Sequence, residues 1–271
     1  RPNVDSKYPD VKIHIHLQKE WLTVSLDSSG DSLHKRGYRT ATNIAPINEV
    51  LAAGMVLLSG YTGDENFIDP MCGSGTILIE AAMIANNIPA NINRKLFAFE
   101  NWKDYDEDLY FTIQESLLKK IRSSHFKIMG FDKAPSAVEK AKANVENANL
   151  DEFIGVHHVN FFNSTKEVFG NTTILFNPPY GERLNIDVEE FYKKIGDTLK
   201  HNYPNSTAWL ITSDTDALKS VGLRTSKRIA LKNADLDCKF VKYELYEGSR
   251  KIKDRKGKID IKTNADSEPE D

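Results

Sequence analysis

The chain has 271 residues, of which 28% are charged and 40% hydrophobic, and its 36 Lys and Arg against 39 Asp and Glu give a net charge of −3. This balance excludes a strongly cationic protein that binds nucleic acid through bulk charge, and the composition excludes a disordered or fibrous chain. No stretch approaches the ~18 uninterrupted apolar residues of a membrane helix. Cys72 and Cys238 lie in no CxxC or Cys/His cluster, so we expect neither a disulfide framework nor a structural metal site, and a reducing cytoplasm fits best.

A β-hairpin is the first element that the sequence predicts. The chain begins with Arg1 rather than Met, so we expect it to be a fragment whose start lies elsewhere. Apolar and polar residues alternate over residues 11–17 (VKIHIHL) and again over 21–26 (WLTVSL), which is typical of two half-buried strands. Two strands cannot bury a core alone, so the hairpin should belong to an upstream domain or lean on the following one. His14 and His16 share a strand face, but no third ligand stands nearby and no metal site is predicted.

Helices and strands alternate from residue 47 onward. The hydrophobic pattern predicts helices over residues 47–59, 76–85, 136–147 and 188–201. It predicts strands over residues 66–69, 127–132, 155–160, 172–177 and 208–212, and a closing antiparallel pair over 225–231 and 239–247. Strands separated by helices indicate an α/β fold, in which helices cover both faces of a mostly parallel sheet. The ligand site of such a fold lies beyond the carboxyl ends of the central strands.

An insertion between residues 86 and 126 is rich in aromatic side chains, namely Phe97, Phe99, Trp102, Tyr105, Tyr110 and Phe111. Such rings could stack on a nucleic-acid base. Packing against the domain is the simpler expectation, because buried aromatic rings commonly dominate a core.

The loop after the first strand of the predicted sheet has the features of a cofactor site. It consists of Asp69, Pro70, Met71, Cys72, Gly73, Ser74, Gly75 and Thr76. Glycines let a ligand approach the backbone, and the free amides at the start of the following helix offer donors. A phosphate-binding P-loop would need a lysine before Thr76, and a dinucleotide fingerprint would need a small residue in place of Leu78. Asp69 instead suits a ligand that carries an ammonium group, as S-adenosylmethionine (SAM) does at its methionine end.

Two further strand ends carry polar residues that suit a nucleoside. Asp132 ends the second strand and could accept hydrogen bonds from both ribose hydroxyls. Capping of the following helix is the alternative for Asp132, and both roles could coexist. Asn160 ends the third strand and is a weaker candidate for a contact with the adenine edge, because any polar strand end would look the same.

The fourth strand ends in Asn177, Pro178, Pro179 and Tyr180. Two prolines fix an extended turn and remove two N–H donors, so carbonyl oxygens dominate this rim. The Asn177 side-chain oxygen and the Pro178 carbonyl could accept both hydrogens of a planar amino group, while Tyr180 stacks on the base that carries it. A merely rigid loop is the alternative. The fourth strand should adjoin the first, however, so that both loops face one cleft and these four residues become the catalytic candidates.

Three segments together resemble the RlmL-type guanine-N2 methyltransferases, which modify 23S ribosomal RNA and carry an N-terminal THUMP RNA-binding domain. The segments are DPMCGSGT at 69–76 with Glu80-Ala81-Ala82, NPPYGERL at 177–184, and LHKRGYR at 33–39 followed by Ala45-Pro46-Ile47. The similarity runs from about residue 11 to 246 and includes KNADLDC at 232–238. The NPPY motif alone also resembles adenine-N6 DNA methylases and the glutamine methylases of release factors, which lack the HKRGYR segment.

This resemblance implies a Rossmann-like class I SAM-dependent methyltransferase with a seven-stranded, mostly parallel sheet and SAM as its cofactor. It also implies three parts, with a THUMP remnant at residues 1–30, a methyltransferase domain at 31–248 and a charged tail at 249–271. Asn160 departs from the pattern, since many SAM enzymes have an acidic residue there. In some bacteria this type of enzyme is fused to a second methyltransferase that makes 7-methylguanosine. Nothing in this sequence predicts that second activity.

The implied reaction is methylation of the exocyclic N2 amine of a guanine in 23S rRNA or in a ribosome-assembly precursor. Alignment of the amine would suffice for it. Neither a metal nor a nucleophile is needed, and Cys72 has no recognisable base as a partner. Three alternatives remain open, which are methylation of guanine N2 in tRNA, an adenine-N6 nucleic-acid methylase, and a SAM-binding RNA chaperone or assembly factor.

The charge of the chain is unevenly distributed. Residues 249–258 hold six basic residues and one acidic residue, whereas residues 260–271 hold five acidic residues and one basic residue. The tail after residue 260 is expected to be disordered. Lys35, Arg36 and Arg39 then become the candidate RNA contacts of the remaining chain. We expect this chain to bind SAM well and RNA poorly, because an upstream domain would supply most of the RNA affinity.

Overall fold

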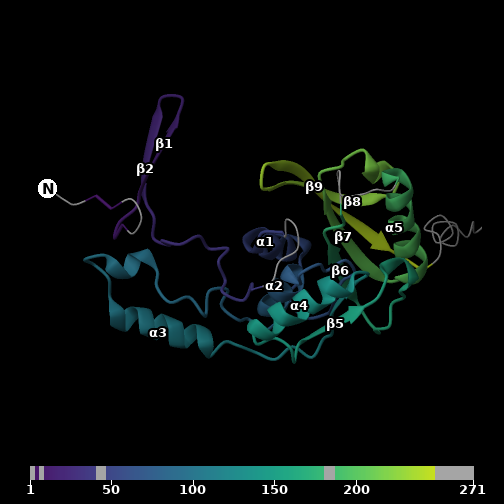
Figure 1. Cartoon of the computed structure of the whole chain (residues 1–271), viewed down its shortest axis with the longest axis horizontal. Helices are drawn as coiled ribbons and strands as arrows, with labels where there is room; N and C mark the ends of the chain where they lie inside the picture. Colours follow the sequence, from purple (N-terminus) through teal and green to yellow (C-terminus); the bar gives the residue numbers. More distant parts are fainter. Residues whose placement is uncertain (1–3, 6–8, 41–46, 180–186, 248–271) are drawn as a thin grey trace, which may run out of the picture.

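The computed structural model describes residues 4–5, 9–40, 47–179 and 187–247, and its centre is a seven-stranded sheet with the order β5-β4-β3-β6-β7-β9-β8. The strands are β3 (Asn66–Asp69), β4 (Ile128–Asp132), β5 (Ile154–His158), β6 (Thr172–Phe176), β7 (Ser206–Thr212), β8 (Thr225–Asn233) and β9 (Leu236–Leu245). The pairs from β5 to β7 are parallel, whereas β9 pairs antiparallel with β7 and β8. The predicted seven-stranded sheet with an antiparallel edge pair is therefore confirmed (Figure 1).

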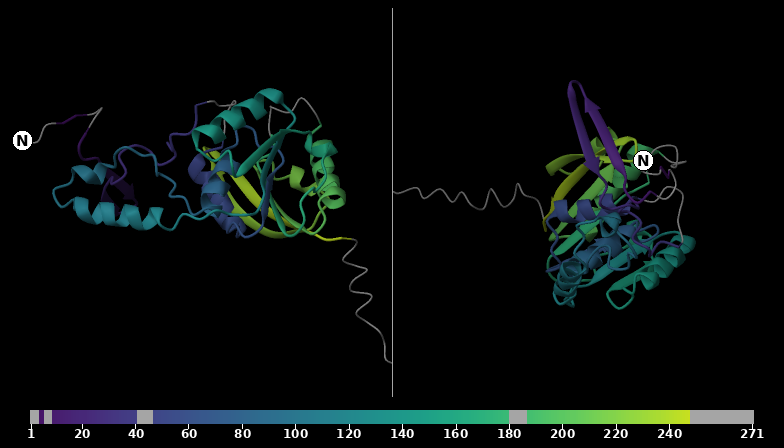
Figure 2. Two further views of the ribbon diagram at one scale, coloured as in Figure 1. Left: turned by 90° about the horizontal axis from the view of Figure 1, so that it is seen from below. Right: turned by 90° about the vertical axis from the view of Figure 1, so that its left-hand side faces the viewer.

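Helices cover both faces of this sheet. On one face, α1 (Glu49–Ser59), α2 (Thr76–Ala85) and α4 (Pro135–Asn147) share a buried core with Phe67 and Ile128. On the other face, α5 (Val188–Asn202) buries its apolar side against Ile174 and Phe176. Figure 2 shows α1 and α2 in blue and α5 in green on opposite sides of the strands. Burial from both sides explains why β6 reads as an uninterrupted buried run, TTILF, as central parallel strands commonly do.

Capping residues and a proline mark the ends of the helices. Asn48 caps α1, since its side chain accepts from the amides of the second and third helical residues, and Gly60 ends the helix with a left-handed φ of 86°. Pro135 opens α4 in the first turn, where its missing N–H costs nothing. Asp187 caps α5 in the same way as Asn48. Two short helices, η2 (Phe161–Asn163) and η4 (Ala217–Lys219), follow β5 and β7.

The predicted hairpin forms, with β1 (Ile13–Gln18) paired antiparallel to β2 (Trp21–Leu26) as a separate two-stranded sheet. Every residue of both strands is exposed. The register places six apolar residues on one face, namely Ile13, Ile15, Leu17, Leu22, Val24 and Leu26. In two views the hairpin projects away from the seven-stranded sheet (Figures 1 and 2).

The aromatic insertion packs beside the segment that follows this hairpin, away from the seven-stranded sheet (Figure 1). It contains η1 (Ala98–Asn101) and α3 (Glu107–Leu118). The Phe99 amide donates to the Ser28 carbonyl at 3.2 Å, and Arg94 Nη2 donates to the Ser29 carbonyl at 2.7 Å. The rings contact one another, with Phe99 centroids 5.3 to 5.9 Å from those of Phe97, Tyr105 and Tyr110. The insertion thus forms a small aromatic cluster of its own, which the sequence pattern did not separate from the main core.

Within the described residues, no helix combines the length and the apolar character needed to cross a bilayer. In the same part of the chain, no three His, Cys, Asp or Glu side chains come together so that they could hold a metal ion. Tyr180 and the charged tail at 249–271 lie outside the described residues.

Two helical glycines give a matched test of the packing. A Cβ at Gly196 of α5 would lie 1.7 Å from the Val221 carbonyl oxygen, whereas a Cβ at Gly54 of α1 would meet nothing within 4 Å. We expect Gly196→Ala to lower the free energy of unfolding by at least about 1–3 kcal/mol, because overpacking must move the backbone. Gly54→Ala should raise it by roughly 0.5–1 kcal/mol, since alanine favours a helix. Urea unfolding measures both, and a Gly196→Ala protein as stable as the wild type would contradict this packing.

Candidate functional site

A cavity of about 360 Å³ lies at the carboxyl ends of β3, β4, β5 and β6. The adjacency of these parallel strands produces it, since β3 pairs with β4 on one side and with β6 on the other. The predicted site residues that line the cavity are Asp69, Pro70, Met71, Cys72, Gly73, Ser74, Thr76, Asp132, Asn160, Asn177, Pro178 and Pro179. The expectation that the two loops face one cleft is thus met. Gly75 is not among the lining residues, although it shapes the loop.

The loop after β3 is tightly folded. Gly75 has a φ of 82° and caps α2, and a Cβ at this position would lie 3.3 Å from Ala141 Cβ, so both conformation and space favour glycine. The Cys72 amide donates to the Phe131 carbonyl at 2.9 Å, and the Gly75 amide donates to the Cys72 carbonyl at 2.8 Å. These bonds hold the loop against the end of β4, so that its outer side faces the cavity.

Asp132 ties this loop to the next strand. One carboxylate oxygen accepts from the Gly73 amide at 3.0 Å and the other from the Ala134 amide at 2.9 Å. The second contact is with the amide of Ala134, the N-cap residue of α4, so Asp132 binds the backbone just before this helix and does not cap the amides of its first turn. A carboxylate has about four acceptor positions, so two used positions leave room for the hydroxyls of a ribose.

Asp69 and Cys72 are buried at the floor of the loop, being 1% and 6% exposed. Burial raises the pKa of Asp69 well above its ordinary value, and the neighbouring Asp132 raises it further. A cation beside Asp69 would therefore relieve an unfavourable burial. Burial likewise raises the pKa of the Cys72 thiol well above its ordinary value. A raised pKa disfavours the thiolate, which agrees with a packing role for Cys72 and not a nucleophilic one.

Asn160 lies two residues beyond the end of β5, which is shorter than the sequence predicts. Its side-chain oxygen accepts from the Phe162 amide at 3.1 Å and caps η2. Phe161 and Phe162 follow directly and also line the cavity. They form an apolar wall there that the sequence analysis missed, and their position after a strand end was the available signal.

Asn177 presents an unused acceptor. Its side-chain oxygen Oδ1 is buried and has no hydrogen-bond partner. A buried acceptor without a donor costs roughly 1–3 kcal/mol, so a ligand N–H group is the natural partner at this end of β6. The orphaned oxygen fits the expected amine, and the buried Asp69 fits the ammonium group of the expected cofactor.

The three candidate RNA contacts do not share a surface. Lys35 is exposed and pairs with Asp31, whereas the side chains of Arg36 and Arg39 are only 7% and 15% exposed. Arg36 donates to both carboxylate oxygens of Glu80, at 3.2 and 3.3 Å. Carboxylates of the domain therefore engage Arg36 and Arg39, which gives both arginines a structural role.

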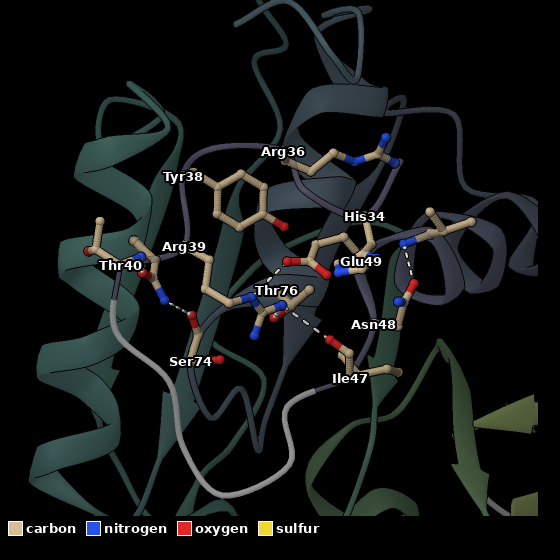
Figure 3. A network of polar contacts seen from close by, with 12 residues as sticks. His34, Arg36, Tyr38, Arg39, Thr40, Ile47, Asn48, Glu49, Ser74 and Thr76 are labelled. Atoms are coloured by element: carbon tan, nitrogen blue, oxygen red, sulfur yellow. Dashed lines mark hydrogen bonds and ion pairs between the residues drawn. The ribbon is translucent and has the colours of Figure 1, made fainter. Parts of the chain in front are cut away.

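The segment that contains these arginines also contacts the end of the loop at 69–76 (Figure 3). Arg39 Nε donates to Glu49 at 2.7 Å, and Arg39 Nη2 donates to Thr76 Oγ1 at 2.9 Å and to the Ile47 carbonyl at 3.1 Å. Asn144 of α4 donates to the Ser74 carbonyl at 2.9 Å. These contacts fix the starts of α1 and α2 relative to each other, and Ile47, Ser74 and Thr76 all line the cavity.

Comparison with known proteins places this geometry in a family. Residues 36–242 match the model of the UPF0020 family, described as RMKL-like, methyltransferase domain. The chain is 34% identical to slr0064 of Synechocystis sp. (strain ATCC 27184 / PCC 6803 / Kazusa), which is provisionally described as an RNA methyltransferase. The aligned 249 residues cover 91% of this chain and 65% of that protein. It is also 36% identical to the ribosomal RNA large subunit methyltransferase K/L of Photobacterium profundum. That alignment of 258 residues covers 93% of this chain and 36% of the relative.

Solved structures agree with this assignment. SMU.472, provisionally described as a methyltransferase and complexed with SAH, is 35% identical with a TM-score of 0.80, covering 88% of this chain and 63% of that one. A protein of Listeria monocytogenes (strain 4b F2365), provisionally described as an N6-adenine-specific DNA methylase, is 32% identical with a TM-score of 0.77, covering 87% and 61%. The predicted class I fold is confirmed. SAH is the demethylated product of SAM, so its presence in a relative confirms SAM as a cofactor of this family.

The chain spans less than two thirds of the length of each of these four relatives. The family model nevertheless matches most of the chain, and it does so across both strand-end loops that build the cavity. This chain therefore belongs to the family of RMKL-like methyltransferase domains.

Proposed function

We propose that this chain transfers a methyl group from SAM to the exocyclic N2 amine of a guanine in RNA, with 23S rRNA as the substrate. The observation that carries the proposal is the unpaired, buried Oδ1 of Asn177 in the cavity that the Asp69–Thr76 loop also lines. One strand end thus offers an acceptor for an amine, and the neighbouring strand end offers a cofactor loop. The family membership supports methyl transfer, and the name of the K/L relative supports large-subunit rRNA as the substrate.

The cofactor would lie along the ends of β3, β4 and β5. Asp69 would accept the ammonium group of the methionine end, and Asp132 would accept the ribose hydroxyls with its remaining acceptor positions. Phe161 and Phe162 would pack on the adenine, with Asn160 at its edge. When bound, SAM supplies an electrophilic methyl group.

The protein's own contribution to the chemistry would be orientation. Asn177 Oδ1 and the Pro178 carbonyl would each accept one amine hydrogen, which directs the nitrogen lone pair toward the methyl group. Proper alignment of two reactants is worth several powers of ten in rate without any nucleophile. Tyr180 would stack on the base, Pro179 would keep the turn rigid, and the amine would release one proton to solvent. We assign no residue as a base, because the amine can lose its proton to solvent after the transfer.

The pair of acceptors selects an exocyclic amine but does not by itself distinguish guanine from adenine. A relative at 32% identity is provisionally described as an N6-adenine-specific DNA methylase, so adenine N6 is a second candidate. Both amines are planar and present two hydrogens, which the same pair of acceptors would hold. We further propose that residues 1–30 belong to a THUMP RNA-binding domain and that Lys35 is the remaining candidate for an RNA contact within 35–39.

Asp132→Ala tests the cofactor half of this proposal. The substitution removes two backbone hydrogen bonds and the ribose acceptors, so we expect affinity for SAH to fall about tenfold or more. Asp106→Ala is the control, because it also removes an aspartate that accepts from a backbone amide near a helix start. It should cost up to about 1 kcal/mol of stability and leave SAH binding unchanged. Titration calorimetry and thermal melting measure both effects. Wild-type SAH affinity in a destabilised Asp132→Ala protein would restrict Asp132 to its two backbone contacts.

Asn177→Ala tests the catalytic half. We expect methyl transfer to fall at least about a hundredfold, because the amine loses the acceptor that orients it, while SAH affinity changes little. Asn171→Ala is the control, since this exposed residue lies at the opposite end of β6. The assay offers labelled SAM with 23S rRNA, tRNA and DNA at high concentration, and the methylated nucleoside is identified by mass. N2-methylguanosine in 23S rRNA is the expected product.

Other products decide between the alternatives. Methylated tRNA would identify tRNA as the substrate in place of 23S rRNA, and N6-methyladenine would identify adenine as the target base. Undiminished turnover by Asn177→Ala would contradict the proposed role of this residue. Remodelling of RNA that survives loss of both Asp69 and Asn177 would favour a chaperone.

A further inference from the structure

Arg39 has one more donor group than its protein acceptors use. Its Nε and Nη2 atoms are engaged by Glu49, Thr76 and the Ile47 carbonyl, as described above. Nη1 is buried and has no hydrogen-bond partner. An unpaired N–H group on a buried cation is unfavourable, so the site favours an additional acceptor.

The position of this side chain limits what that acceptor can be. Ile47 and Thr76, which both accept from Arg39, also line the cavity. The guanidinium therefore lies next to this part of the cavity lining, beside Ile47 and Thr76 (Figure 3). This part of the lining belongs to the half of the cavity that contains the Asp69 loop, and the nucleoside candidates Asp132 and Asn160 come from β4 and β5.

The charges of the described lining residues also favour Arg39 as the partner of an acidic ligand group. They include two acidic side chains, Asp69 and Asp132, and one basic side chain, Lys133. Lys133 is exposed and follows β4, at the proposed nucleoside end. The methionine end of SAM carries a carboxylate as well as an ammonium group, and a carboxylate in a partly buried site needs a cation or several N–H donors. Asp69 can serve the ammonium group, whereas Arg39 beside the cavity lining can serve the carboxylate.

We propose that Arg39 is the anchor for the carboxylate of the methionine end of SAM, which accepts a hydrogen bond from Nη1. Glu49 and the cofactor carboxylate then flank one guanidinium, and Arg39 joins cofactor binding to the fixed geometry of α1 and α2. Arg36 has no such role, because Glu80 engages it through two of its nitrogens. The proposal depends on SAM as the cofactor and not on the target base, so its test needs no RNA.

The experiment compares two ligands that differ in one group. SAH carries the carboxylate, whereas S-adenosyl-3-thiopropylamine lacks it and keeps the adenosine, the sulfur and the ammonium group. We expect the wild-type chain to prefer SAH by about tenfold or more. In Arg39→Met combined with Glu49→Gln, which avoids a buried unpaired carboxylate, this preference should fall to less than about threefold. Titration calorimetry gives both dissociation constants, and thermal melting checks folding.

Arg36→Met combined with Glu80→Gln is the matched control, because it removes the neighbouring buried ion pair and should keep the preference for SAH. An equal loss of affinity for both ligands in the Arg39 variant, or an unchanged preference, would overturn the proposal. If that double variant does not fold, Arg39→Lys keeps the charge but cannot span the same acceptors, and its preference for SAH should still fall. Failure of wild-type protein to bind SAH would instead contradict the cofactor assignment.

Discussion

The parallel pairing of β3 with β6 is the constraint on which the rest of the site depends. Three residues of β3 pair in register with three of β6, from Asn66 with Thr172 to Ile68 with Ile174. Because side chains at both faces are buried, a slip by one residue would place core side chains on the wrong face. The fixed register brings Asp69 and Asn177, more than a hundred residues apart in the chain, to the rim of one cavity.

The buried ion pairs Arg36–Glu80 and Arg39–Glu49 fix the positions of neighbouring segments more than they stabilise the fold. Burial raises the pKa of Glu80 even though Arg36 and Tyr38 oppose the shift. The burial of Glu80 is thus only partly offset by its partners, as is common for buried ion pairs. These pairs hold residues 36–39 against α1 and α2. Ile47, which precedes the cap of α1, and Thr76, the first residue of α2, both line the cavity. The contacts of Arg39 thus join the starts of both helices to the loop at 69–76.

Local patterns were sufficient to predict most of the fold from the sequence. The alternation in β1 and β2, the buried run of β6 and the amphipathic α5 each depend on residues close in the chain. Since parallel strands end at the same edge of a sheet, the positions of Asp69, Asp132 and Asn177 also followed from the strand order.

Long-range partners could not be predicted in the same way. Arg36 and Arg39 look like surface cations in an HKRGYR segment, because their carboxylate partners stand 44 and 10 residues further along the chain. The same holds for the insertion, because its apolar rings would suit any core. Its backbone contacts with residues 28 and 29 place it beside the segment that follows the hairpin. In both cases the missing information is which distant segment fills the neighbouring space.

A crystal structure of this chain with SAH and guanosine would test the central claim most directly. We expect SAH in the cavity, with its ammonium group at Asp69, its carboxylate at Arg39 and its ribose at Asp132. We expect the guanine amine at Asn177 Oδ1, facing the sulfur of SAH. SAH bound elsewhere, or bound here with Asn177 Oδ1 still without a donor and the guanine amine turned away from the sulfur, would contradict this claim.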